Sequence, residues 1–169
     1  MVTIVQKGEP VLRTRAKEVN LLEISSNKIR DLLRSMQETL QRCEEGVALA
    51  APQIGEPLRI FVVDARTWKG AAPEHEPLIY INPQLVKQSK TKKEMDEGCL
   101  SVTGMYGKTQ RATRATVEAY NENGKKFTRG ASGLLAQIFQ HEIDHLNGIL
   151  FVDHAKDLVK VEQKQNQVQ

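Results

Sequence analysis

The segment Gln140–Gly148 has the sequence QHEIDHLNG, which places two histidines four residues apart and a glutamate directly after the first. It ends a longer helical pattern, whose first apolar stripe comprises Leu135, Phe139, Ile143 and Leu146. A neighbouring stripe ends in the two imidazoles and comprises Leu134, Ile138, His141 and His145. The pattern therefore predicts a core helix from about Ser132 to Asn147, with Ser132 capping its start and Gly148 ending it.

The spacing of the two histidines predicts a metal site. Side chains four residues apart lie on one face of a helix, so His141 and His145 can bind the same ion. Glu142 points beside that ion, where a carboxylate suits the role of general base for a metal-activated water. Motifs of this length also arise by chance on helices, but this one lies on a helix with an apolar stripe and a cap at each end.

A catalytic site of this kind needs a third protein ligand. Zinc peptidases with this motif use either a later histidine, a position held here by Phe151, or a downstream glutamate. Glu162 is the only glutamate after the motif, and it lies in a polar tail. Cys99 is the better candidate, because a glycine precedes it and a thiolate binds zinc-like and ferrous ions strongly. We expect Cys43, which lies at the end of a helix, to be structural.

The rest of the chain indicates one further helix and several short strands. A helix is predicted from about Ser26 to Glu44, with a stripe of Ile29, Leu32, Leu33, Met36 and Leu40. Leu58–Asp64 is typical of a buried strand, and two short strands are expected on either side of Pro83. Asn123-Gly124 favours a tight hairpin turn, because both residues tolerate a positive φ.

The composition is that of a globular protein, with 40% hydrophobic residues, 27% charged residues and a net charge of +3. No repeat or linker divides the 169 residues, so we expect a single domain 1–169, with a polar tail over 153–169 that has a weak helical pattern. This charge makes no case for DNA binding, and no apolar run approaches the ~20 residues of a membrane helix. The first residues lack the pattern of a secretion or transit signal, which favours a cytoplasmic protein.

Three segments together resemble the motifs of the peptide deformylase family, in the family's order and at similar spacing. They are GVALAAPQIG (Gly46–Gly55), EGCLS (Glu97–Ser101) and HEIDHLNG (His141–Gly148). The resemblance implies an α+β fold, with antiparallel β-sheets packed around a central metal-binding helix and another helix in the N-terminal half. It also implies removal of the formyl group from the N-terminal formylmethionine of newly made polypeptides.

The resemblance assigns roles to individual residues. Cys99, His141 and His145 would bind one divalent ion, Fe²⁺ first and Zn²⁺, Ni²⁺ or Co²⁺ as alternatives, and Glu142 would act as general base and acid. The Gln53 side-chain amide and the Leu100 backbone N–H would stabilise the oxyanion. The residues expected to bind the substrate are Gly46, Val47, Ala48, Met95, Gly98, Leu134 and Ile138. Glu97 and Arg111 would form an ion pair bracing the cysteine loop, and Tyr106 would edge the peptide groove.

The expected partners are formylmethionyl nascent peptides, with a transient contact between the tail and the ribosome left open, and the expected state is a monomer.

Ala48 replaces the second glycine of the family's first motif, and Thr103 replaces a proline found in many members. Two alternatives stay open. The first is a metallopeptidase that cleaves ordinary peptide bonds, which leaves EGCLS unexplained, and the second is a non-catalytic metal-binding paralogue, suggested by Ala48.

Overall fold

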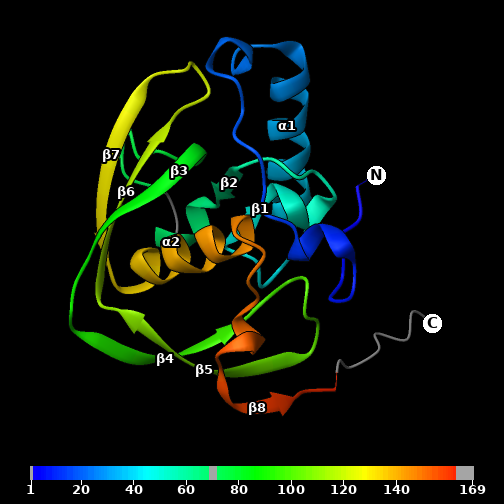
Figure 1. Ribbon diagram of the computed structural model, residues 1–169, viewed down its shortest axis with the longest axis vertical. Coiled ribbons are helices and arrows are strands. Elements are labelled where there is room, and N and C mark those ends of the chain that lie inside the picture. Colours follow the sequence, from blue (N-terminus) through cyan, green and yellow to red (C-terminus); the bar gives the residue numbers. More distant parts are fainter. Residues whose placement is uncertain (1, 69–71, 163–169) are drawn as a thin grey trace.

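The computed structural model describes residues 2–68 and 72–162. Helix α2 (Gly133–Leu146) lies in the middle of the molecule, between a five-stranded and a three-stranded sheet (Figure 1). Its predicted stripe is buried against the larger sheet, where Tyr80 stacks on Phe61 at 4.5 Å and meets the Phe139 ring edge-on at 5.3 Å. The α+β fold predicted from the resemblance, with antiparallel sheets around this helix, is confirmed.

The two ends of α2 differ from each other in how they are capped. Ser132 occupies the N-cap position, but its side chain accepts no capping hydrogen bond, so the predicted cap is wrong in its chemistry. Gly148 ends the helix with φ 76°, as predicted. A Cβ on this residue would also lie 2.7 Å from the carbonyl oxygen of Arg13, so the position requires glycine for space as well as for conformation.

The larger sheet is antiparallel, in the order β1-β2-β3-β6-β7. Its strands are β1 (Ala48–Ala50), β2 (Ile60–Val63), β3 (Ile79–Gln88), β6 (Arg114–Tyr120) and β7 (Lys126–Ser132). The prediction of two strands around Pro83 is wrong, because β3 runs through the proline with a shift in register between Ile81 and Gln84. The shift lets the strand continue at a residue that cannot donate to the ladder.

The hairpin between β6 and β7 forms at the predicted place with a different turn. The backbone N–H of Asn121 donates to the carbonyl of Lys125, so residues 122–124 form a three-residue loop. Only Gly124 has a positive φ, 75°, whereas the prediction required this of Asn123 as well. A three-residue loop of this type needs a left-handed residue only at its end.

The smaller sheet has the order β4-β5-β8, with β4 (Lys92–Gly98), β5 (Met105–Ala112) and β8 (Lys156–Lys160). The weak helical pattern of the tail suggested a helix, which is wrong for residues 156–160, because they form β8 and pair antiparallel with β5. Every residue of β8 is exposed, so backbone hydrogen bonds to β5, and not an apolar face, determine its conformation. The remainder of the tail, residues 163–169, lies outside the described residues.

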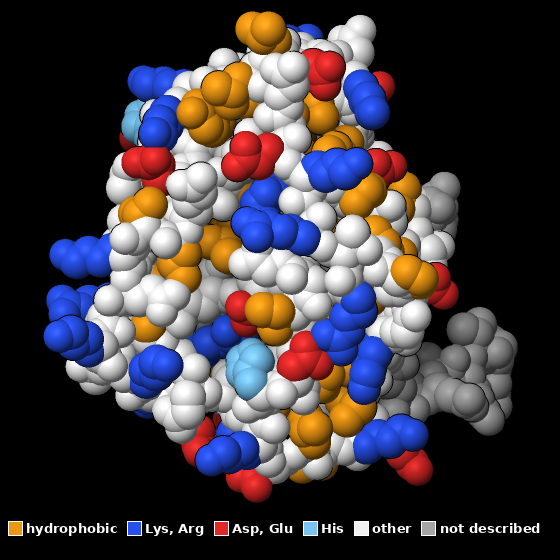
Figure 2. Space-filling model, in the orientation of Figure 1, with side chains coloured by type: hydrophobic (Ala, Val, Ile, Leu, Met, Phe, Trp, Pro, Cys, Tyr) orange, Lys and Arg blue, Asp and Glu red, His pale blue; other side chains and the backbone are white. Residues whose placement is uncertain are grey.

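Helix α1 (Asn27–Gln41) packs on the opposite side of β1 and β2 from α2, in a second apolar cluster that includes Met36, Leu49 and Val62. The sequence allows either Ser25 or Ser26 as its N-cap, and the structure has Ser26, whose side chain accepts a hydrogen bond from the N–H of Ile29. The helix ends at Gln41, three residues before the predicted end. No helix in the described residues has the length and apolar character needed to cross a membrane. Basic side chains lie along the left edge and over the centre and right of the face shown in Figure 2, and acidic side chains are interspersed among them.

Candidate active site

The structure brings together the two histidines of α2 and Cys99, which follows the last residue of β4. One ligand atom from each lies within 4.8 Å of the other two, and among the described residues this is the one such group of three. Cys99 Sγ lies 3.2 Å from His145 Nε2, and the two imidazole rings are 4.9 Å apart. One sulfur and two nitrogens are donors that would suit zinc-like and ferrous ions.

Glu97 holds His141 from the side away from this cluster. His141 Nδ1 donates to Glu97 Oε1 at 2.6 Å, which leaves Nε2 free to bind an ion. Arg111 donates to both oxygens of Glu97, at 2.5 and 3.0 Å, and also to Asp144 at 2.7 Å. Thr109 completes the set with a 2.6 Å hydrogen bond. The Glu97–Arg111 pair thus connects the strand before Cys99, through β5, to the helix that carries both histidines.

Burial and charge act in opposite directions on these groups. Burial raises the pKa of Glu97, but the hydrogen bonds from His141 and Arg111 outweigh it and hold the pKa well below its ordinary value. Burial lowers the pKa of His145, as does the neighbouring His141, so His145 is a neutral imidazole that can bind a cation. His145 Nδ1 is buried without a hydrogen-bond partner among the described residues, so it lacks the support that Glu97 gives to His141.

Glu142 lies beside the ligand cluster and is not one of its members. Its side chain is 3% exposed, and its Oε2 atom has no hydrogen-bond partner among the described residues. Burial raises the pKa of this carboxyl to about 7. A buried carboxylate oxygen without a partner fits a site in which a further group, such as a water molecule, supplies the missing hydrogen bond.

Gln53 and Leu100 approach the cluster from two separate loops. Gln53 is 2% exposed and stands in a short 3₁₀ helix, η3 (Ala51–Ile54). Its Oε1 accepts the N–H of Ala50, which fixes the amide so that Nε2 faces the cysteine loop. There Nε2 donates to Ser101 Oγ at 3.1 Å and lies 3.6 Å from Cys99 Sγ. Leu100 follows Cys99 directly and lines the cavity that opens in front of the cluster.

A cavity of about 300 Å³ opens in front of the cluster, between the edge strands β1 and β4 and helix α2. The expected substrate-binding residues that line it are Gly46, Val47, Ala48, Gly98, Leu134 and Ile138. Met95 is not among the lining residues. It precedes Glu97 by two positions on β4, and a strand rise of about 3.3 Å per residue carries it past the cavity.

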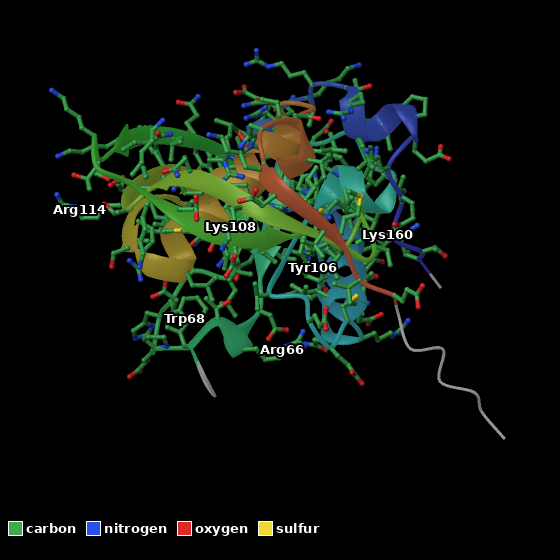
Figure 3. All side chains as sticks on the ribbon, turned by 90° about the horizontal axis from the view of Figure 1, so that it is seen from below. Arg66, Trp68, Tyr106, Lys108, Arg114 and Lys160 are labelled. Carbon is green, nitrogen blue, oxygen red and sulfur yellow. The ribbon has the colours of Figure 1, made fainter. Side chains whose placement is uncertain are left out.

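Two further observations concern residues that line this cavity, Tyr106 and Ala48. Tyr106 projects from β5, the strand that also carries Lys108 (Figure 3), and its hydroxyl donates to Glu45 at 2.9 Å. Ala48 lies in an extended strand and is 8% exposed. It is not among the residues with positive φ, so alanine costs no backbone strain here.

Several residues of this site were not predicted from the sequence, among them Ser101, Glu45 and Gln137. Ser101 is fully buried and accepts a hydrogen bond from Gln53. Glu45 and Gln137 line the cavity, and Gln137 also donates to the backbone carbonyl of Asp96. Gln137 could have been found, because it precedes His141 by four residues and therefore shares its helix face. Glu45 carries no comparable signal beyond its place directly before Gly46.

Comparisons with known proteins agree with this geometry. The family model of polypeptide deformylase matches residues 1–161. Peptide deformylase of Dictyoglomus thermophilum is 42% identical over 159 residues, covering 93% of this chain and 95% of the relative. The enzyme of Halothermothrix orenii is 46% identical over 146 residues, covering 86% and 88%.

Solved structures give the same result. A peptide deformylase from Synechococcus elongatus, in complex with actinonin, has a TM-score of 0.82 and 36% identity and covers 92% of this chain and 81% of that one. A Met-Ala-Ser-bound peptide deformylase from Acinetobacter baumannii has a TM-score of 0.81 and 34% identity, with 90% and 98% covered. A family model and full-length relatives above 40% identity, together with this fold, show that the chain belongs to the peptide deformylase family.

Proposed function

We propose that this chain removes the formyl group from the N-terminal formylmethionine of newly made polypeptides, with formate as the second product, using the residues described above. One observation supports the assignment of these residues. Three ligand atoms lie within 4.8 Å of one another beside the same cavity as a buried Glu142 oxygen that has no hydrogen-bond partner among the described residues. The relative with bound Met-Ala-Ser, a peptide that begins with methionine, supports a substrate of this class.

Cys99, His141 and His145 would hold the ion, and we propose Fe²⁺, although the same donors accept Zn²⁺, Ni²⁺ and Co²⁺. When bound, such an ion acts as a Lewis acid and lowers the pKa of a water molecule to ~7. Glu142 Oε2 takes a proton from the attacking water and later delivers it to the departing amine. A pKa of about 7 suits a group that must both accept and release a proton near neutral pH.

Gln53 Nε2 and the N–H of Leu100 would donate to the formyl oxygen as it becomes negative. The substrate backbone would lie between β1 and β4, which are edge strands of the two sheets and both line the cavity. Leu134 and Ile138 offer apolar surface to the methionine side chain. We also propose that the chain forms one catalytic domain and acts in the cytoplasm, supported by its bacterial relatives.

One assay tests the proposal against both alternatives. Formate release from a formyl-methionyl peptide is measured with and without a chelator, and cleavage of the same peptide without its formyl group is measured in parallel. A deformylase releases formate only when the metal is present and leaves the unformylated peptide intact. A metallopeptidase would cleave that peptide, and a non-catalytic paralogue would act on neither.

Glu97→Gln is expected to weaken metal binding by about 10- to 100-fold, the usual effect of removing a partner that orients a metal-binding histidine. The amide has no charge with which to hold Arg111 and accepts at one atom only. The metal dissociation constant, obtained by competition with a chelator, measures the effect. Asp96→Asn is the matched control, because Asp96 neighbours Glu97 on β4 but is exposed and binds Lys108. Equal affinities in all three proteins would show that Glu97 has no such role.

Ala48→Gly is expected to change kcat/KM for formyl-methionyl peptides by at most ~10-fold. The extended backbone at Ala48 needs no glycine, so the only direct change is the loss of one methyl group from the cavity wall. Stability should fall by ~0.5–1 kcal/mol, because glycine loses more backbone entropy in a strand. If metal-loaded wild-type protein releases no formate and Ala48→Gly does, the alanine has inactivated the enzyme.

A further inference from the structure

We propose that the N-terminal segment Val5–Lys7 is a brace that fixes the two oxyanion donors relative to each other, with Gln6 as its positioning residue. The inference rests on the proposed function, because it takes Gln53 and Leu100 as those donors. In Figure 1 the blue N-terminal segment runs beside the short cyan helix that carries Gln53.

The backbone of this segment contacts both donor loops. The N–H of Val5 donates to the carbonyl of Gln53 at 2.8 Å, and the N–H of Lys7 donates to the carbonyl of Ser101, next to Leu100, at 2.7 Å. The Val5 side chain packs with the apolar cluster that contains Val102. Two alternate residues of one short segment therefore hold the two loops, which are far apart in the sequence.

The side chain of Gln6, between these two anchors, reaches the cysteine loop itself. Its Nε2 donates to the carbonyl of Leu100 at 3.0 Å. Its Oε1 accepts from the hydroxyl of Thr103 at 2.8 Å and lies 3.4 Å from the Thr103 backbone N–H. The Gln6 amide thus connects Leu100, which carries the second oxyanion donor, to Thr103 at the far end of the same turn.

The two loops need such a support because neither donor belongs to a long helix or a strand. Gln53 stands in a four-residue 3₁₀ helix, and Leu100 stands in the turn between β4 and β5. Donors stabilise a developing oxyanion only when they already point at it, so a small displacement of either loop reduces the rate. Within that turn, a hydroxyl at position 103 gives the loop a contact with Gln6 that a proline could not make.

The exposure of the Gln6–Thr103 hydrogen bond allows a positioning role to be distinguished from a role in folding. Gln6 and Thr103 are both exposed, so a hydrogen bond between them contributes little to the stability of the fold. Loss of this hydrogen bond should therefore lower the rate of the chemical step and leave the stability of the fold unchanged. Interactions that act only in the transition state lower kcat and kcat/KM together and leave KM unchanged.

The test compares Gln6→Ala and Thr103→Val with wild type in the metal-loaded, full-length protein. Each variant should lower kcat by about 3- to 10-fold, the effect of one lost hydrogen bond, with KM, metal content and Tm unchanged. Thr103→Ser keeps the hydroxyl and should restore wild-type kcat. The double variant should be no slower than the slower single variant, because both remove one shared contact. Gln41→Ala, at another exposed glutamine whose side chain makes no hydrogen bond in the described structure, is the matched control.

Gln53→Ala distinguishes failure of this inference from failure of the proposed function. If Gln53→Ala is slow while Gln6→Ala and Thr103→Val match wild type, Gln53 is important for activity and the brace is refuted. If Gln53→Ala also matches wild type, the oxyanion assignment and the brace both fail. Loss of metal or a large drop in Tm in Gln6→Ala would overturn the inference too, because Gln6 would then be structural. Absence of formate release by wild type would refute the proposed function itself.

Discussion

Glu142→Gln is expected to lower kcat by at least ~100-fold while the protein keeps its full metal content. Glutamine has the same shape as glutamate, but it cannot accept the proton of the attacking water or return one to the amine. Glu142 is also the residue after His141 on α2 and stands outside the group of three ligand atoms. The ion should therefore stay bound when its charge is removed.

The measurement pairs steady-state kinetics on a formyl-methionyl peptide with metal analysis of the same sample. The variant should fold normally, because the amide replaces a buried carboxyl whose pKa is raised to about 7 by burial. If the metal is lost together with the activity, Glu142 is a ligand and its assigned role is wrong. If kcat falls by less than ~10-fold, another group serves as the general base.

Cys99→Ala is expected to abolish tight metal binding and, with it, formate release. The thiolate would be one of three protein ligands and the only charged one, since both histidines would bind the ion as neutral imidazoles. We expect a loss of affinity larger than the ~10- to 100-fold caused by removing an outer partner such as Glu97. Metal content after dialysis, and the dissociation constant from chelator competition, measure it directly.

Cys43→Ala provides the matched control, because it removes the other cysteine of the chain. Its sulfur lies 3.3 Å from the carbonyl of Thr39 at the end of α1, outside the ligand cluster. This variant should bind metal and turn over like wild type. Full metal content with normal turnover in Cys99→Ala would exclude the thiolate as a ligand, and a third ligand would then have to be sought elsewhere.

The local part of the site follows from the sequence. A helix places residues four apart on one face, so the spacing of His141 and His145 already predicts that they can bind one ion and that Glu142 points beside it. The apolar stripe of the same helix determines which side enters the core, and Gly148 determines where it ends. These features depend on contacts between residues that are close in the chain, and such contacts can be predicted from sequence patterns.

The position of Cys99 against the two histidines depends on the tertiary structure, and only the resemblance to a family predicted the residues around it. Neither the turn after β4 nor the pairing of β4 with β5 follows from periodicity, although together they carry Cys99 and Glu97 to α2. The same holds for Met95, whose distance along β4 removes it from the cavity, and for β8, whose polar sequence gains its strand conformation from β5.

The N-terminal segment is the clearest case of a feature that the sequence did not reveal. Gln6 is an exposed polar residue without a pattern around it, and its contacts lie 94 and 97 residues away in the chain. Local propensity determines which segments form helices, but the sheets and the core determine which distant loops meet. For this protein, the sequence alone predicted the histidine pair, Glu142 as general base and Cys99 as third ligand. The tertiary structure decided how the cysteine loop, the Gln53 amide and the Glu97 carboxylate meet the two histidines, because long-range packing has no local signature.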